Sequence, residues 1–191
     1  MPSRLLSVIA LLCVASALHA QPEAPARFQI YGGYSYLSNS LNGVTGSHHS
    51  LDGFDASIAF LPWHSLRFKI DTAAYIGSNL GAPQHPIYIL AGGQFSHRFG
   101  RETAFVEGLA GTGGANQTWA ANGATGEKAS FASLLGGGLD TRLTEHLAFR
   151  VEGGYQYSYF YLIQPSTFVP YLIPGLPRNF GRLSSGLVWE F

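Results

Sequence analysis

The sequence predicts an all-β fold, an eight-stranded antiparallel up-and-down transmembrane β-barrel. Three observations support this prediction. Only 12% of the 191 residues are charged, against roughly 25% in soluble proteins. Segments of about ten residues alternate apolar with small or polar residues, which is typical of strands with two different faces. The connections between these segments are alternately short and long, as in barrels with short turns at one end and long loops at the other.

Composition excludes several other classes of protein. The 46% hydrophobic content argues against disorder because there is apolar surface to bury. The 11 basic and 11 acidic residues balance, whereas a nucleic-acid partner would call for a basic face. A helical membrane protein would need roughly 20 consecutive apolar residues, and nothing beyond the N-terminal region supplies them. We therefore expect no nucleic-acid partner and no spanning helix.

Residues 1–20 are typical of a secretory signal peptide. Arg4 is the only charge and precedes an apolar run over 5–18, which is shorter than the roughly 18 residues a membrane anchor needs. We expect cleavage after Ala20, with Ala17 as the alternative site. The only cysteine, Cys13, would leave with the peptide. Residues 21–26 would then form a short N-terminal segment, and the barrel would cover 27–191.

Eight segments carry the alternating pattern. The clearest is 66–76, where Leu66, Phe68 and Ile70 alternate with Arg67 and Lys69. Short connections are expected near 62–65, 99–102 and 143–147, and long ones near 38–51, 77–86, 115–128 and 162–177. The expected strands are about 27–37, 52–61, 66–76, 87–98, 103–114, 129–142, 148–161 and 178–191.

The charged faces of these strands are expected to point into the barrel. An arginine facing lipid near the midplane costs about 2–4 kcal/mol, so several charges in mid-strand positions would prevent insertion if they pointed outward. Buried charges are tolerated when they are paired and hydrogen-bonded. A soluble β-sandwich with a solvated charged face is the alternative. The predicted internal ion network, which would plug the barrel, comprises Arg67, Lys69, Asp71, Arg98, Glu107, Asp140, Arg142, Arg150, Glu152 and Glu190.

The last residues, 184–191, resemble the C-terminal assembly signal of bacterial outer-membrane barrels. Ser184, Gly186, Trp189 and Phe191 match its polar, glycine and aromatic positions. Together with the glycine-rich pieces 32–36 and 136–140, they make residues 27–191 resemble the small eight-stranded outer-membrane β-barrel family of the OmpA-transmembrane-domain and OmpX kind ("outer membrane beta-barrel domain" proteins). The resemblance implies a location in the outer membrane of a Gram-negative bacterium. It also implies contact with outer-membrane lipid and lipopolysaccharide, and recognition by the barrel-assembly machinery.

For function, we expect a non-enzymatic, monomeric barrel with a structural or surface-interaction role. Its long extracellular loops, above all the apolar loop 162–177, would contact an extracellular ligand or protein. A narrow or transient pore is one alternative, and an outer-membrane lipid-modifying enzyme is another. The close Ser/His pairs are 48–50 and Ser96 with His97, and neither has an evident orienting carboxylate. No cofactor or metal site is predicted.

Overall fold

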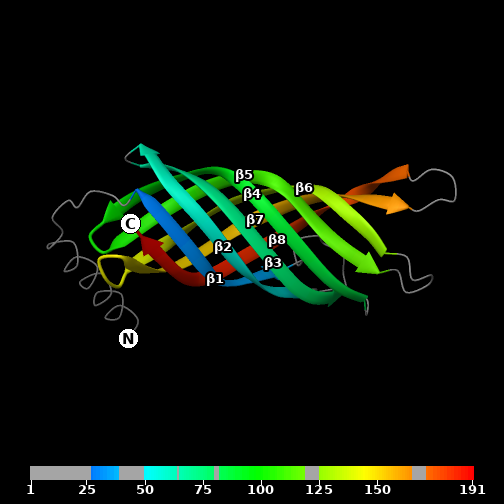
Figure 1. Cartoon of the computed structure of the whole chain (residues 1–191), viewed down its shortest axis with the longest axis horizontal. Coiled ribbons are helices and arrows are strands. Elements are labelled where there is room, and N and C mark those ends of the chain that lie inside the picture. The colour runs from blue at the N-terminus through cyan, green and yellow to red at the C-terminus, as the bar shows by residue number, and fades with distance from the viewer. Residues whose placement is uncertain (1–26, 39–49, 64, 80–81, 119–124, 165–170) are drawn as a thin grey trace, which may run out of the picture.

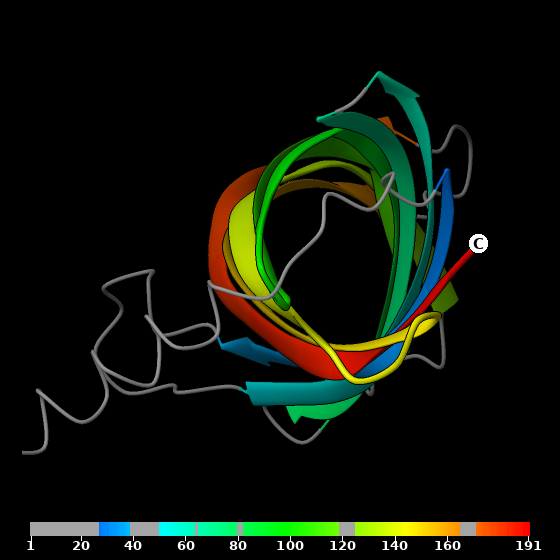
Figure 2. The same ribbon diagram turned by 90° about the vertical axis from the view of Figure 1, so that its left-hand side faces the viewer.

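The computed structural model describes residues 27–38, 50–63, 65–79, 82–118, 125–164 and 171–191, and these residues form one closed antiparallel barrel. Each strand pairs with the next along the chain, and β8 pairs with β1 to close the ring, as Figures 1 and 2 show. The predicted fold class is confirmed. The strands are β1 (Phe28–Ser38), β2 (Ser50–Trp63), β3 (Leu66–Asn79), β4 (Ala82–Phe99), β5 (Glu102–Thr118), β6 (Thr125–Arg142), β7 (Leu147–Gln164) and β8 (Tyr171–Glu190).

The signal peptide, both of its candidate cleavage sites and the segment 21–26 lie outside the described residues. In the part of the chain that the structure describes, no helix is long and apolar enough to cross a bilayer.

Along each strand, the side chains whose burial the structure describes alternate between the inside and the outside of the barrel, as period-two sequence patterns require. On β5, Phe105, Glu107 and Leu109 are buried, whereas Val106 between them is 61% exposed. The outward set is apolar on all sides of the barrel; Leu135 on β6, for example, is 72% exposed. The structure therefore has the inverted arrangement predicted from the charge positions. Apolar side chains lie outside the barrel and charged side chains lie inside.

Aromatic side chains mark the end of the barrel that carries the short turns. Trp63, Phe99, Trp189 and Phe191 are all at least half exposed there. Phe28 and Phe191 lie with their ring centroids 6.1 Å apart, which brings the first and last strands together at this rim. Aromatic belts of this kind lie at the membrane–water interface in transmembrane barrels.

The turn between β4 and β5 shows why this end is compact. Gly100 has a positive φ of 68°, a backbone conformation that glycine adopts without strain. Phe99 pairs with Glu102 across the turn, so only two residues connect the strands. At the same end, the Arg27 amide donates to the Phe191 carbonyl at 3.0 Å.

At the opposite end the strands run further than predicted, so three of the expected long loops are mostly strand. Residues 77–79 pair with 82–84, and 115–118 pair with 125–128. β7 and β8 continue past a register shift between Tyr159 and Tyr161, and the pairing ends at Gln164 with Tyr171. Proline, glycine and polar residues in these stretches resemble loop composition, but each hairpin extends a ladder that its own two strands already form. The first predicted loop falls largely at 39–49, outside the described residues.

Candidate functional site

The barrel interior holds charged and polar side chains in successive layers, starting at the short-turn end. Arg98 Nη2 lies 3.2 Å from a carboxylate oxygen of Glu190. The Gln29 side-chain amide donates to the other oxygen of Glu190 at 2.5 Å. Beside them, Arg67 Nη1 donates to the Ser96 hydroxyl at 2.6 Å. This layer lies at the end of the barrel nearest the turns.

The next layer is a two-pronged ion pair between Arg150 on β7 and Asp140 on β6. The guanidinium Nε and Nη2 donate to the two carboxylate oxygens at 2.6 and 2.7 Å. Strand register places these two residues directly opposite each other. The Arg150 guanidinium carbon also lies 4.4 Å from the ring centroid of Phe105 and 5.4 Å from that of Tyr31. Bidentate pairing and ring stacking both favour arginine over lysine here.

Lys69 on β3 forms the third layer. Its Nζ lies 3.0 Å from Glu107, 3.2 Å from Glu152 and 3.7 Å from Asp71, and its side chain is completely buried. A flexible ammonium with three donors suits a position where carboxylates arrive from several strands. One cation thereby joins β3, β5 and β7 across the inside of the barrel.

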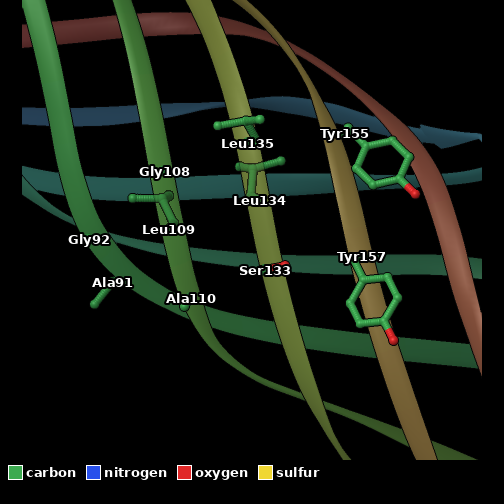
Figure 3. Close-up of a pocket in the computed structure, with 10 residues that line it drawn as sticks. All are labelled: Ala91, Gly92, Gly108, Leu109, Ala110, Ser133, Leu134, Leu135, Tyr155 and Tyr157. Atoms are coloured by element: carbon green, nitrogen blue, oxygen red, sulfur yellow. The ribbon is translucent and has the colours of Figure 1, made fainter.

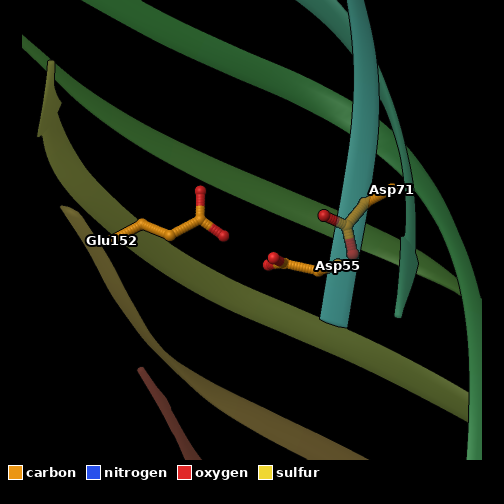
Figure 4. A group of neighbouring side chains, drawn as sticks. All are labelled: Asp55, Asp71 and Glu152. Carbon is orange, nitrogen blue, oxygen red and sulfur yellow. The ribbon is translucent and has the colours of Figure 1, made fainter. Parts of the chain in front are cut away.

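Arg182 on β8 joins a second group of carboxylates. It lies 2.5 Å from Asp55 and 2.8 Å from Asp71, with Glu152 at 3.6 Å. Figure 4 shows the three carboxylates converging from β2, β3 and β7. Because Asp71 and Glu152 also contact Lys69, this layer and the previous one form a single connected network.

The three carboxylates form the one cluster of potential metal ligands found among the described residues, with ligand atoms within 4.8 Å of one another. Hard cations such as Ca²⁺ accept such oxygens. Arg182, however, donates to Asp55 and to both oxygens of Asp71. The positive charge that a metal ion would contribute therefore comes from the protein, and the cluster acts as an ion-pair centre.

The structure brings most of the predicted network together and changes its membership. Arg67 is buried and bonds Ser96. Arg142 lies at the rim, where its guanidinium donates to the carbonyl oxygens of Thr144 and Glu145, so its prediction as a member of the inner plug is corrected. The predicted residues that take part in interior ion pairs are Lys69, Asp71, Arg98, Glu107, Asp140, Arg150, Glu152 and Glu190.

Sequence reasoning missed two members of the network, Asp55 and Arg182. Both lie on strand faces that the alternation assigned to the interior. Both lie further from the short turns than the other charges of the network. The depth of a residue along the barrel axis depends on strand tilt and stagger. These bring the Arg182 guanidinium into ion pairs with Asp55 and Asp71.

Beyond the charges, toward the loop end, most of the buried side chains are apolar, with Ser35, Gln156 and Ser158 as polar neighbours. On β3 the buried Lys69 and Asp71 are followed by the buried Ala73 and Tyr75, and on β5 Glu107 is followed by Leu109. This apolar layer was not predicted from the sequence, and it forms the larger of the two buried hydrophobic clusters among the described residues. Its members are Leu37, Leu51, Ala73, Tyr75, Tyr88, Leu90, Leu109, Ala132, Leu134 and Phe180.

The four residues of the predicted assembly signal occupy different environments. The Ser184 hydroxyl donates to Glu152 at 3.0 Å inside the barrel, and Gly186 faces inward against β1. Trp189 and Phe191 lie outside at the rim, 6.4 Å apart between ring centroids. Ser184 therefore belongs to the ion network as well as to the C-terminal motif.

The Ser96–His97 pair considered for catalysis is split by the barrel wall. Ser96 is buried inside and accepts from Arg67, whereas His97 is exposed on the outer face. Residues 48–49 lie outside the described part of the chain. Within the described interior, most of the charged groups pair with one another, which connects strands across the barrel.

Comparison with solved structures places this architecture among small outer-membrane barrels. Neisserial surface protein A matches with a TM-score of 0.60 at 14% identity, over 88% of this chain and 100% of that one. OprG from Pseudomonas aeruginosa matches with 0.58 at 13%, over 91% and 99%. Ail, the attachment invasion locus protein of Yersinia pestis, matches with 0.57 at 16%, over 87% and 99%.

No protein-family model matches the sequence, and neither does any curated protein. At these identities the structural likeness shows the fold. It confirms the resemblance predicted from the sequence: the chain is a barrel of the bacterial outer-membrane type.

Proposed function

We propose that the protein is a non-enzymatic, monomeric outer-membrane barrel with a structural or surface-interaction role, carried by the hairpins at its loop end. One observation carries this proposal. Among the described residues, an ion network and an apolar cluster are buried in the interior, while two hairpins continue well beyond the closed part of the barrel. This arrangement supports a barrel that acts through its extended outer end and not through a channel.

Strand lengths indicate how far these hairpins project. A transmembrane strand needs about 9–11 residues, but β7 has 18 and β8 has 20. Among the described residues, β6 pairs with β7 as far as Ser130 with Phe160, and β1 pairs with β8 as far as Ser38 with Gly181. The β7–β8 hairpin past these pairs therefore stands apart from the ladders that β6 and β1 form with it.

The names of two structural neighbours are in line with a surface role. One is a Neisserial surface protein, and another is the attachment invasion locus protein of Yersinia pestis. We propose that the hairpins of this chain likewise contact a protein or ligand outside the cell. Outer-membrane lipid and lipopolysaccharide would surround the wall. Ser184, Gly186, Trp189 and Phe191 would serve as the signal that the barrel-assembly machinery recognises.

Shortening the β7–β8 hairpin tests the surface role. Residues 160–176 would be replaced by a two-residue Asn-Gly turn, which suits a tight hairpin. The matched control shortens the β5–β6 hairpin in the same way over residues 116–127. Chemical cross-linking on intact cells, followed by mild detergent extraction, should recover surface partners with the full chain and with the control. Equal recovery from the shortened β7–β8 variant would contradict the role of this hairpin.

The pore alternative leads to our first prediction. Side chains fill the interior of an eight-stranded barrel, and here buried ion pairs obstruct it. The full chain reconstituted in planar bilayers should therefore give no steady single-channel current, under conditions in which a large porin conducts and flotation with liposomes shows that the protein has inserted. Stepwise, steady current from the purified barrel would favour the pore.

The enzyme alternative is tested through its substrate. A lipid-modifying barrel would change the mass of lipid A, and we expect identical lipid A spectra from cells with and without the protein. A mass shift that depends on the protein would overturn the non-enzymatic proposal.

A further inference from the structure

The outer wall of the barrel is not uniformly convex. A hollow of about 420 Å³ lies over β4–β7, as Figure 3 shows. Its floor contains the small side chains of Ala91, Ala110 and Ser133 together with Gly108, and the larger residues around it include Leu135, Tyr155 and Tyr157. This volume falls within the roughly 300–1,000 Å³ typical of small-molecule sites.

Strand register builds the hollow from two neighbouring rows of residues. One row runs from Ala91 through Ala110 and Ser133 to Tyr157. The other runs from Gly93 through Gly108 and Leu135 to Tyr155. Small residues thus come together on β4 and β5, whereas Leu135 on β6 and Tyr155 and Tyr157 on β7 are large. The result is a depression with one tall side, formed by these three large side chains.

The barrel does not require glycine at the centre of this hollow. A Cβ atom on Gly108 would have no other atom within 4 Å. A Cβ on Gly92 or Gly111, on the inner side, would collide with the backbone of the neighbouring strand. Close strand packing therefore accounts for Gly92 and Gly111 but leaves Gly108 unexplained. Gly108 shares its open surroundings with the outward-facing Gly32, but it differs from Gly32 in lining the hollow, where it keeps the floor low.

The surroundings of the hollow favour a lipid chain as its occupant. The hollow lies in the apolar outer surface of the barrel, with the exposed side chains of Ile89 and Val106 beside it. In the membrane, this surface contacts the hydrocarbon chains of the lipids. The tall side lies toward the loop end, where the Tyr155 hydroxyl donates to Asn179 at 2.5 Å. Tyrosine at that level is typical of the membrane interface. A chain lying in the hollow would therefore descend from the outer leaflet.

We propose that the hollow holds one acyl chain of lipopolysaccharide, the glycolipid of the outer leaflet, with the sugar headgroup near Tyr155 and Asn179. The chain would lie over Gly108 and Ala110 and against Leu135 and Tyr157. This inference rests on the outer-membrane location but not on the role of the hairpins. It adds a defined lipid site to a wall that otherwise contacts lipid nonspecifically.

Filling the hollow is the direct test. Gly108→Leu adds a side chain where space is open, and Gly32→Leu is the matched control, since a Cβ on the outward-facing Gly32 also has nothing within 4 Å. Both proteins would be folded with purified rough lipopolysaccharide, and the retained lipid counted by native mass spectrometry after gentle detergent removal. We expect Gly108→Leu to retain about five- to tenfold less lipopolysaccharide than the control, because the contacts of several methylene groups are lost.

Three outcomes would overturn the proposal. The first is equal retention of lipopolysaccharide by the two variants. The second is an equal loss of phospholipid in a parallel experiment with phosphatidylethanolamine, which would show no preference for the glycolipid. The third is a dimer of the unmodified chain that Gly108→Leu abolishes, which would assign the hollow to contact between two copies. Ser133→Leu fills the same floor from β6 and replaces Gly108→Leu if that variant does not fold.

Discussion

Arg182 is the residue on which the interior network most depends. Its side chain is 1% exposed and contacts Asp55, Asp71 and Glu152. These three acids come from three other strands, so a single guanidinium on β8 connects four parts of the wall. If it were removed, the acids would remain buried close together, with Lys69 beside Asp71 and Glu152 and with Arg150 4.0 Å from Glu152.

We therefore predict that Arg182→Met lowers the free energy of unfolding by about 3–5 kcal/mol, the usual cost of removing one partner of a buried ion pair. Arg142→Met is the control. It removes an arginine that bonds turn carbonyls at the rim, and it should cost about 1 kcal/mol or less. Urea titration of the folded proteins in lipid vesicles, followed by tryptophan fluorescence, measures both values. Equal losses would show that the inner network contributes no more than the rim.

At the scale of the elements, the contact between β1 and β8 closes the barrel. Gly186 faces inward on β8 opposite Gly33. A Cβ atom at Gly186 would collide with the backbone of Gly32 and Gly33. Glycine at this position of the C-terminal motif thus has a packing reason of its own, separate from any recognition by assembly machinery.

Gly186→Ala should accordingly destabilise the closed barrel by about 1–3 kcal/mol, the range typical of overpacking. Gly32→Ala, on the outer side of the same pair of strands, should change stability little, since its Cβ would meet open space. Refolding of purified protein into liposomes, scored by heat-modifiable gel migration, separates this effect from assembly in the cell. If the Gly186→Ala barrel were as stable as the Gly32→Ala barrel, packing would not explain the glycine at position 186. Recognition by the assembly machinery would then be its remaining role.

The elements also show which features a sequence can predict. Alternation placed Phe105, Glu107 and Leu109 inside because a strand side chain can point only two ways. Alternation could not predict where β7 and β8 end, near Gln164 and Tyr171. A hairpin outside the membrane keeps its backbone hydrogen bonds without needing an apolar face. The partners of Arg182 could not be predicted either, because alternation gives the face on which a residue lies but not its depth along the barrel axis.

For the whole molecule, the membrane inverts the arrangement of a soluble β-barrel. The buried interior contains the charges, and the exposed surface contains the aliphatic side chains. Paired acids and bases remove the cost of isolated charges, and the apolar layer at the loop end adds packing above them. The same inversion explains the low charge content, since only the interior and the two ends have places for charge.

This inversion predicts a dependence of stability on depth along a single strand. Ile70 and Leu66 both point outward from β3 and are 38% and 39% exposed. Leu66 lies next to the short turn, whereas Ile70 lies four residues further along the strand, deeper in the part expected to cross the membrane. In lipid vesicles, Ile70→Arg should lower the free energy of unfolding by about 2–4 kcal/mol and Leu66→Arg by about 0–1 kcal/mol. Denaturant titration in a thin and a thick bilayer measures both. Similar small losses at the two positions would mean that water, not hydrocarbon, surrounds this face.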